Sequence, residues 1–455
     1  MNTLGKMLTL ILGLALSSGP LSGEPSPERL TVSHAVDLAV RNNLDVRNAG
    51  LEVAIQQRMK DHSFNVLFPT ISTGITASRL NDPAASNVYL PAGPPSYVTV
   101  VTPDSNNLSL SLKIQEIFTP AILAQFAQLD DNLSEAKITR EQAVRSVTAS
   151  VRKFFYQLLV QKESIELTQA RLKNSEERLR QSGISYQLGQ ETELSYAQNQ
   201  IDVDNLRPQL EQQKTGFTNS LVTFQELLGV TPRTDLILDG NLDDEPVILP
   251  PTPLLVAHRL NLRAEESQSN NLKTGKDLQV LGVLPALVFQ YSADPNANGP
   301  QNLNLLDTNN WPQKTGALSM TLSWNLESFI PGSSFWDKTA TFDSRIELAR
   351  ERALQIEQND RDDIENRRRS IQTSQSAIAS LKAAVQSTKR AQVLTEAAYK
   401  LGTGRLLDLQ AAELNNQSTQ ILLLNEELNL KGLVLDLESQ LDVDLESLYS
   451  QSTSS

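Results

Sequence analysis

The feature of this sequence that most constrains its fold is an internal duplication. Leu188-Gly189 closes a seven-residue series of mostly apolar positions, and a similar series ends at Leu401-Gly402, displaced by 213 positions. Earlier, Leu44-Asp45-Val46-Arg47 recurs as Leu260-Asn261-Leu262-Arg263, displaced by 216 positions. Solenoid repeats are roughly 20 to 50 residues long, so a repeat of about 215 residues predicts one architecture built in two similar halves.

Each half is expected to contain one very long helix. Residues 122–187 and 338–400 contain no proline and keep a largely apolar seven-residue repeat. At 1.5 Å per residue each helix would be about 100 Å long, which no compact domain accommodates. A second helix follows each glycine-containing turn, so each half predicts an antiparallel helical hairpin. Pro208 is expected to kink or end the first return helix locally. The expected hairpin tips consist of Leu188, Gly189, Leu401, Gly402, Thr403 and Gly404.

Two pairs of amphipathic strands are expected before the long helices. Apolar side chains alternate with small hydroxyl or polar ones over four segments, residues 71–79, 108–114, 287–291 and 318–326. This period of two is typical of strands with one apolar face. Residues 81–105 and 294–315 are expected to be long exposed loops. The positions expected to face a membrane are Ile71, Ile75, Leu108, Leu110, Leu112, Leu287, Phe289, Leu318, Met320, Leu322 and Trp324.

All three tryptophans, Trp311, Trp324 and Trp336, lie in or beside the second strand pair. Such clustering suits an aromatic girdle at a bilayer surface. The alternative is an ordinary half-buried sheet whose tryptophans fill a local core.

The N-terminus predicts a secreted chain, and the composition excludes several kinds of site and partner. A lysine at position 6, an apolar run over residues 8–16 and small residues up to position 23 form a pattern typical of a secretory signal peptide. The sequence contains no cysteine, which excludes disulfides, thiolate metal sites and an acylated N-terminal cysteine. The formal net charge of −13 argues against a nucleic-acid partner. No later segment has the roughly 20 consecutive apolar residues of a membrane-spanning helix, so the mature chain could enter a membrane only as strands.

The sequence does not favour an enzyme. Its three histidines, His34, His62 and His258, lie on separate segments without metal-ligand spacing. No glycine-rich phosphate loop or nucleophile elbow is present. We therefore expect no catalytic residues, no cofactor and no bound metal.

Four strands are too few to close a membrane barrel, because the smallest known membrane barrels have about eight. Open strand edges in lipid would leave backbone groups unpaired. Several copies of the chain would therefore have to share one barrel, and the apolar seams of the helices also require neighbours. The residues thus predict a hollow tube of several chains, with strands in a membrane and helices projecting from it.

The order of these features resembles the TolC family of outer-membrane efflux and secretion channels. The resemblance rests on residues 44–47, on the proline before each first strand (Pro69 and Pro285), on the Tyr399–Asp408 segment and on the doubled spacing. It implies a mostly α fold with a small β part, in which duplicated helical hairpins form an α-barrel. It further implies a homotrimer with a shared 12-stranded transmembrane β-barrel. The implied partners are outer-membrane lipid, a periplasmic membrane-fusion adaptor and an inner-membrane transporter.

The resemblance also implies a gate at the periplasmic end of the helices. Asp408 is similar in position to the outer member of an aspartate ring, although it could equally be an exposed carboxylate favoured by the start of its helix. The sequence departs from the family pattern at three positions: Ala411 replaces a second aspartate, Gly404 replaces an arginine, and Ser195 replaces an aspartate. The residues expected at the gate are Asp408, Tyr399, Arg405 and Ser195.

The expected function is that of an outer-membrane channel, the exit duct of a tripartite efflux or type I secretion system in a Gram-negative bacterium. The alternative is a secreted periplasmic coiled-coil scaffold or adaptor that binds partners without forming a pore. The expected segments are a signal peptide (1–23), an N-terminal segment with the first helix (24–69), a strand hairpin (70–115), a helical hairpin (116–230), a linker (231–253), the first helix of the second half (254–283), a second strand hairpin (284–327), a second helical hairpin (328–442) and a C-terminal tail (443–455).

Overall fold

The structure is a computed structural model that describes residues 29–80, 84–90, 96–102, 105–232, 236–242, 259–300, 307 and 316–441. The expected signal peptide, Trp311 and the expected C-terminal tail fall outside these residues. The described residues belong to two compact units. The strand unit draws on residues 43–149, 247–377 and 432–455, and the helical unit draws on 1–42, 150–246 and 378–431.

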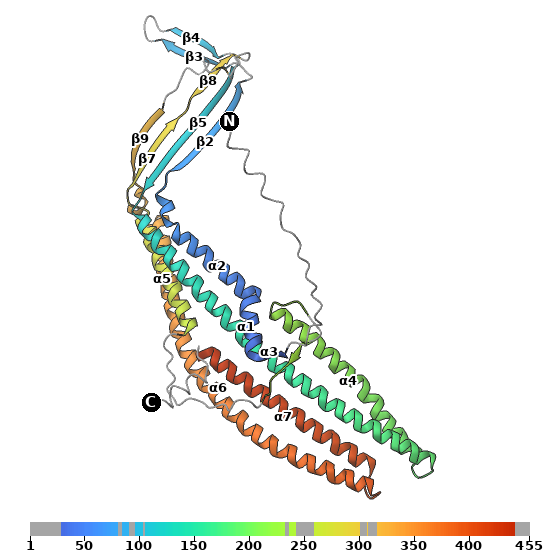
Figure 1. The fold of residues 1–455 in the computed structure, drawn as a ribbon. Coiled ribbons are helices and arrows are strands. Elements are labelled where there is room, and N and C mark those ends of the chain that lie inside the picture. Colours follow the sequence, from blue (N-terminus) through green and yellow to red (C-terminus); the bar gives the residue numbers. More distant parts are fainter. Residues whose placement is uncertain are drawn as a thin grey trace, which may run out of the picture. The chain divides into compact units, whose positions relative to one another are not determined.

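The strand unit contains an antiparallel sheet in the order β2-β5-β7-β9, whose strands lie side by side in Figure 1. Its strands are β2 (Thr70–Leu80), β5 (Ser105–Phe118), β7 (Ala286–Ala293) and β9 (Gly316–Ser323). Apolar residues face one another across the ladders, since Ile75 pairs with Leu110 and Phe289 with Met320. Both expected strand pairs are therefore present, and the pairing of β5 with β7 joins them in one sheet.

The expected loops of residues 81–105 and 294–315 are wrong in part. The first contains an antiparallel pair, β3 (Ala84–Leu90) and β4 (Ser96–Thr102), and the second contains β8 (Asn296–Pro300), which pairs with β5. The run of β-branched and aromatic residues in 96–102 favours a strand. The prolines around it obscured that signal in the sequence.

The first helix, which was expected within residues 24–69, is interrupted. It consists of α1 (Val32–Asn42) and α2 (Leu44–Asp61), followed by a 3-10 helix, η1 (Ser63–Leu67). Asn43 separates α1 from α2, because its Oδ1 accepts hydrogen bonds from the backbone N–H of Asp45 (2.8 Å) and of Val46 (3.4 Å). Such capping satisfies the first N–H groups of a helix, and so a second helix begins here.

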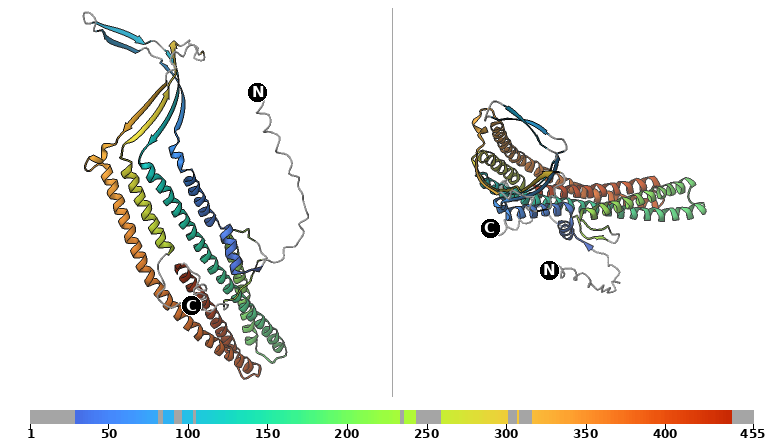
Figure 2. Two further views of the ribbon diagram at one scale, coloured as in Figure 1. Left: turned by 60° about the vertical axis from the view of Figure 1, so that its left-hand side comes forward. Right: turned by 90° about the horizontal axis from the view of Figure 1, so that it is seen from above.

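The two long helices are α3 (Ala121–Gln187) and α6 (Ser334–Lys400). Each has 67 residues, about 100 Å of helix, and runs through parts of both units. Their return helices are α4 (Glu193–Leu227) and α7 (Leu406–Leu441). Figure 2 shows α3 alongside α4 and α6 alongside α7, as two helical hairpins. In the helical unit we call α3 with α4 the first hairpin, and α6 with α7 the second hairpin.

Pro208 lies inside α4, which continues without a break from Glu193 to Leu227. Of the two expected effects of Pro208, a kink or a local end of the helix, the end is therefore wrong. The buried side chains of Val203, Leu206 and Leu210, at most 4% exposed, anchor the helix on both sides of the proline. The burial of these apolar side chains stabilises the helix and compensates for the backbone hydrogen bond that is lost because proline has no N–H to donate.

The core of the helical unit lies around the middle of α3. Val151, Phe155 and Leu158 of α3 are fully buried, as are Phe224 of α4 and Leu228, which directly follows α4. The rings of Phe155 and Phe224 pack with their centroids 6.2 Å apart. A short parallel pair, β1 (Arg29–Leu30) with β6 (Ile237–Leu238), belongs to the same unit and was not expected from the sequence.

The remaining described elements complete the strand unit. Helix α5 (Leu260–Leu281) precedes β7, and a second 3-10 helix, η3 (Leu326–Phe329), follows β9. Among the described residues, no helix combines the length and apolar character that are needed to span a bilayer.

Candidate gate at the hairpin tips

Both hairpin tips close through glycines in the left-handed region. Gly189 has φ 65° and Gly402 has φ 72°, a conformation that glycine adopts without strain. The adjacent Leu188 and Leu401 are 66% and 79% exposed. Each tip therefore presents a large apolar side chain next to a tight turn, which suits contact with another protein.

The backbone around Gly404 explains why this position lacks a side chain. A Cβ at residue 404 would lie 3.0 Å from the backbone N of Tyr399 and 3.1 Å from atoms of Ala398. The backbone of the second tip therefore passes too close to residue 404 for an arginine to fit without a shift. The neighbouring Arg405 is exposed and lies just before α7.

Tyr399 and Ser195, which were expected separately, are brought together at the tips. The Tyr399 side chain lies near the side chains of Asn199 and Ser195 of α4, and Ser195 Oγ donates to Oε1 of Glu191. Burial raises the pKa of the Tyr399 hydroxyl, and the nearby charge of Glu191 adds to this effect. The neutral tyrosine of the second hairpin thus lies against the first hairpin.

Asp408 lies in the first turn of α7, and its side chain is exposed. Among the described residues, Asp408 and Arg405 form no side-chain hydrogen bond or ion pair within the chain. The structure of one chain therefore does not place them with Tyr399 and Ser195. Asp408 is free to act on solutes or on other copies of the chain, and the helix dipole favours a carboxylate at this end.

Sequence reasoning missed the most heavily charged group of this region. Arg171 of α3 donates to Gln417 Oε1 of α7 (2.9 Å), and Arg178 of α3 donates to Glu413 Oε1 of α7 (2.5 Å). Both arginines also approach Asp202 of α4, with Arg171 Nη2 at 3.1 Å from Oδ1 and Arg178 Nη2 at 3.6 Å from Oδ2. The four charged side chains are only 7–16% exposed. We call these five residues the arginine network.

Small hydroxyl side chains complete the arginine network. Ser175 Oγ donates to Asp202 Oδ2 (2.7 Å), and Thr168 Oγ1 accepts from Gln417 Nε2 (3.2 Å). Thr168, Ser175 and Ser182 are buried and spaced seven residues apart, as Arg171 and Arg178 are. This polar seven-residue series beside the apolar one was the signal in the sequence that could have indicated the network.

Most apolar positions expected to face a membrane are exposed. In the strand unit the exposed fractions are 69% for Ile71, 73% for Ile75, 80% for Leu318, 68% for Met320 and 69% for Leu322. Leu110, Leu112 and Phe289 are each 37% exposed, and Leu108 and Leu287 are half-buried. A run of exposed apolar side chains along a sheet indicates a surface that water does not cover in the working protein.

Neither described tryptophan fills a local core. Trp324 is 52% exposed and packs edge-on against Phe329, with ring centroids 5.7 Å apart. Trp336 is 51% exposed and packs against Phe335, with ring centroids 5.4 Å apart. In sequence, Trp324 directly follows β9 and Trp336 lies in the first turn of α6. Exposed tryptophans that follow an apolar strand favour an aromatic girdle over a half-buried core.

Residues 35–230 match the family model described as outer membrane efflux protein. The matched segment covers the first strand pair and the first helical hairpin, and the duplication extends the same plan to the second half. This segment, just under half of the chain, is similar to the outer membrane efflux protein family. This places the protein in the outer membrane as an efflux channel, with its helical part in the periplasm, and does not favour a poreless periplasmic scaffold.

Solved outer-membrane channels share the fold. The CmeC channel of Campylobacter jejuni is 15% identical, with a TM-score of 0.68 over 98% of this chain and 97% of that one. The open state of the MtrE channel of Neisseria gonorrhoeae is 18% identical, with a TM-score of 0.67 over 91% and 89% of the two chains. VceC of Vibrio cholerae is 18% identical, with a TM-score of 0.64 over 90% and 95%. No curated protein sequence matches this chain significantly.

Proposed function

We propose that three copies of this chain form one closed tube that serves as the exit duct for an inner-membrane transporter. The observation that carries the proposal is the run of four neighbouring strands, β2, β5, β7 and β9, in the sheet of the strand unit. Its apolar face is exposed, and its outer strands β2 and β9 each pair on one side only among the described strands. Three such sheets supply twelve strands, enough to close a barrel without free edges in lipid.

The hairpin tips are the proposed docking site for a periplasmic membrane-fusion adaptor that connects the channel to the transporter. The exposed Leu188 and Leu401 offer apolar contacts, and the turns beside them have fixed backbone geometry. The channel conducts its cargo without chemistry and needs no resident cofactor. The cargo is either small molecules, as in efflux, or proteins, as in type I secretion.

The proposal is tested by fractionation and electrophoresis. We expect the full chain to separate with the outer membrane and to run as a heat-modifiable trimer. We also expect the purified trimer to carry ion currents in planar lipid bilayers. A monomer that is found wholly in the soluble periplasmic fraction would rule the proposal out.

Replacement of Asp408 by alanine tests its role at the gate. In a trimer, three Asp408 carboxylates would ring the axis and attract cations, as charged rings do in selective pores. We expect Asp408→Ala to require about tenfold more of a multivalent cation to block the current, equivalent to about 1.4 kcal/mol. Block is measured on single channels in planar bilayers.

The matched control is Asp204→Ala, which removes an exposed carboxylate from α4 farther from the tip. This control is expected to leave cation block unchanged. If Asp408→Ala and Asp204→Ala both behave like the unaltered protein, then Asp408 is only an exposed helix-start carboxylate.

A further inference from the structure

Arg259, directly before α5, is a buried arginine whose hydrogen-bonding capacity is almost unused. Its side chain is 4% exposed, and its Nη1 lies 2.6 Å from Oδ2 of Asp360 of α6. This ion pair lacks hydrogen-bond geometry, and Nε, Nη1 and Nη2 of Arg259 have no hydrogen-bond partner within the described part of the chain. A guanidinium has five N–H donors, and buried donors without acceptors are costly. The site therefore calls for a further acceptor beside Arg259.

The beginning of α5 calls for an acceptor as well. Asn43, at the equivalent position of the first half (259 − 216 = 43), caps α2 with its Oδ1. Arg259 is the N-cap residue of α5, but its side chain has only donors and makes no capping hydrogen bond. The first turn of α5 also contains no acidic residue. A carboxylate at this place would interact favourably with both the positive end of α5 and the guanidinium.

The duplication places Asp442 beside this site. In the first half, Gly229 follows α4 with φ 69° and lies against Asn42, since a Cβ at residue 229 would be 2.5 Å from the backbone O of Asn42. The equivalent positions of the second half are Asp442 and His258 (229 + 213 = 442; 42 + 216 = 258). Gly229 and Asp442 are each preceded by a leucine and followed by a valine. The residue that replaces the glycine at this junction is therefore acidic, and it is expected next to Arg259.

The end of α7 lies close to the beginning of α5. Both belong to the strand unit, and Figures 1 and 2 show the last turn of α7 near the first turn of α5, alongside α6. Arg367 of α6 pairs with Asp436 of α7 at 3.1 Å. Asp360 precedes Arg367 by two helical turns, and α7 runs opposite to α6. The chain therefore reaches the level of Asp360 about seven residues after Asp436, just beyond Leu441.

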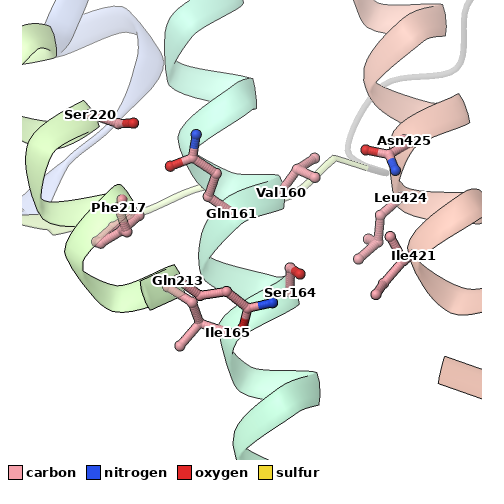
Figure 3. A pocket seen from close by; sticks show the side chains of 11 residues that line it. Val160, Gln161, Ser164, Ile165, Gln213, Phe217, Ser220, Ile421, Leu424 and Asn425 are labelled. Carbon is pink, nitrogen blue, oxygen red and sulfur yellow. The ribbon is translucent and has the colours of Figure 1, made fainter. Parts of the chain in front are cut away.

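The middle of α7 is loosely packed, which makes contacts at its end more important. A cavity of about 350 Å³ lies between α3, α4 and α7. In Figure 3, Ile421 and Leu424 of α7 lie across this space from Val160 and Ser164 of α3. Well-packed interiors have few voids larger than a water molecule. An ionic contact just after Leu441 would therefore stabilise a helix that apolar packing holds weakly in its middle.

We propose that the carboxylate of Asp442 binds Arg259 and caps α5, so that the segment after α7 docks on the beginning of α5. This ion pair replaces the neutral junction of the first half, where Asn43 caps its own helix and Gly229 allows the close approach. Aspartate is among the residues that tolerate the left-handed backbone conformation of Gly229. The junction forms within one chain, so it depends neither on the trimer nor on conduction.

Hydrogen exchange at the first turn of α5 tests the cap in the full-length protein in detergent. We expect Asp442→Gly, which introduces the residue of the first half, to accelerate exchange of the amides of residues 260–263 about tenfold, because these N–H groups lose a capping carboxylate. Exchange is measured by mass spectrometry. The matched control is Asp444→Gly, which removes an acidic side chain two positions farther along and is expected to leave the exchange rate unchanged.

Arg259→Asn shows whether Arg259 mediates the effect of Asp442. Asparagine at residue 259 recreates the self-capping arrangement of Asn43, so the first turn of α5 no longer needs a carboxylate from elsewhere. In this background we expect Asp442→Gly to change the exchange rate of residues 260–263 little. The loss of the partner of Asp360 is common to both members of this second comparison and therefore cancels.

A disulfide tests the placement of residue 442 separately from its charge. In the cysteine-free chain, His258→Cys with Asp442→Cys reproduces the approach of Asn42 and Gly229, where an added Cβ would lie 3.0 Å from the Cβ of Asn42. The Cβ atoms of a disulfide are about 3.5–4.5 Å apart, so a small adjustment is enough. We expect oxidation to close an intrachain disulfide, seen as faster migration of the denatured, unreduced chain. His258→Cys with Ser447→Cys should form the bond more slowly.

Three results would overturn the docking of Asp442 on Arg259. The first is the same exchange in Asp442→Gly as in Asp444→Gly. The second is an equal effect of Asp442→Gly with Arg259 and with Asn at residue 259. The third is faster exchange in Asp244→Asn without any change in Asp442→Gly, which would assign the site to the linker before Arg259. A failure to form trimers or to carry current would instead overturn the proposed function, because exchange at α5 is read within one chain.

Discussion

Met320→Arg is expected to abolish assembly of the trimer in the outer membrane, whereas Ser319→Arg, one position away, is expected to preserve it. Met320 lies near the middle of β9, is 68% exposed and stands opposite Phe289 on the apolar face. Ser319 points to the opposite face, because side chains alternate along a strand. An arginine at the lipid midplane of a barrel costs about 2–4 kcal/mol, or about 6–12 kcal/mol for three copies.

The measurement is the yield of heat-modifiable trimer in the outer-membrane fraction, with total expression as the reference. The two variants share the strand and the added charge, and they place that charge on opposite faces of β9. Equal yields would show that the apolar face of β9 does not meet lipid.

Elements with a long, regular signal could be predicted from the sequence. The seven-residue repeat extends over most of α3 and α6, and no proline interrupts it. The alternation in β2, β5 and β9 is similarly clear, because one apolar face is filled at every second residue. In each of these elements many residues support the same assignment of helix or strand. A wrongly placed end residue therefore does not change the type of element that is predicted.

Elements that depend on single side chains were harder to predict. The break between α1 and α2 comes from one capping amide, Asn43, inside an otherwise helical pattern. The course of α4 through Pro208 depends on tertiary packing, which local propensity does not contain. At Pro208, tertiary context overrode a local rule.

The candidate gate also contains residues that a sequence pattern indicates and residues that only contacts in the structure reveal. The duplication makes Tyr399 equivalent to Tyr186 and Asp408 equivalent to Ser195, but it gave no reason for Tyr399 to lie beside Ser195. Arg171 and Arg178 were overlooked because charged residues at seven-residue spacing usually lie on a solvated face. Only the contacts with α4 and α7 show that they are nearly buried.

The duplication also fixes how strands of neighbouring copies should pair. Within the chain, Thr70 pairs with Gln115 and Ala286 pairs with Ser323, so β2 corresponds to β7 and β5 corresponds to β9. The observed pairing of β5 with β7 then serves as the template for pairing β9 of one copy with β2 of the next. Under this correspondence, the observed pair Ile114 with Tyr291 becomes Leu322 with Ile75 of the neighbouring copy. Both of these residues are exposed and apolar in the single chain, at 69% and 73%.

The same register places Thr321 opposite Thr76 of the neighbouring copy. We therefore expect the double variant Thr321→Cys with Thr76→Cys to form disulfides between chains upon oxidation, and to give covalent dimers and trimers in SDS after heating. The chain has no other cysteine that could contribute. Directly opposed Cβ atoms in an antiparallel pair are about 4.5–5.5 Å apart, within the reach of a disulfide after a small adjustment.

The control for this register is Ser319→Cys with Thr76→Cys, which shifts one thiol by two residues along the same face of β9. Diagonal neighbours are about 7–8 Å apart, so cross-linking should be much slower. Faster cross-linking of the shifted pair would mean that the two halves of the chain do not repeat the same strand geometry between copies. Cross-linking of neither pair would mean that β9 and β2 do not meet, and a barrel closed by three equivalent sheets would then be excluded.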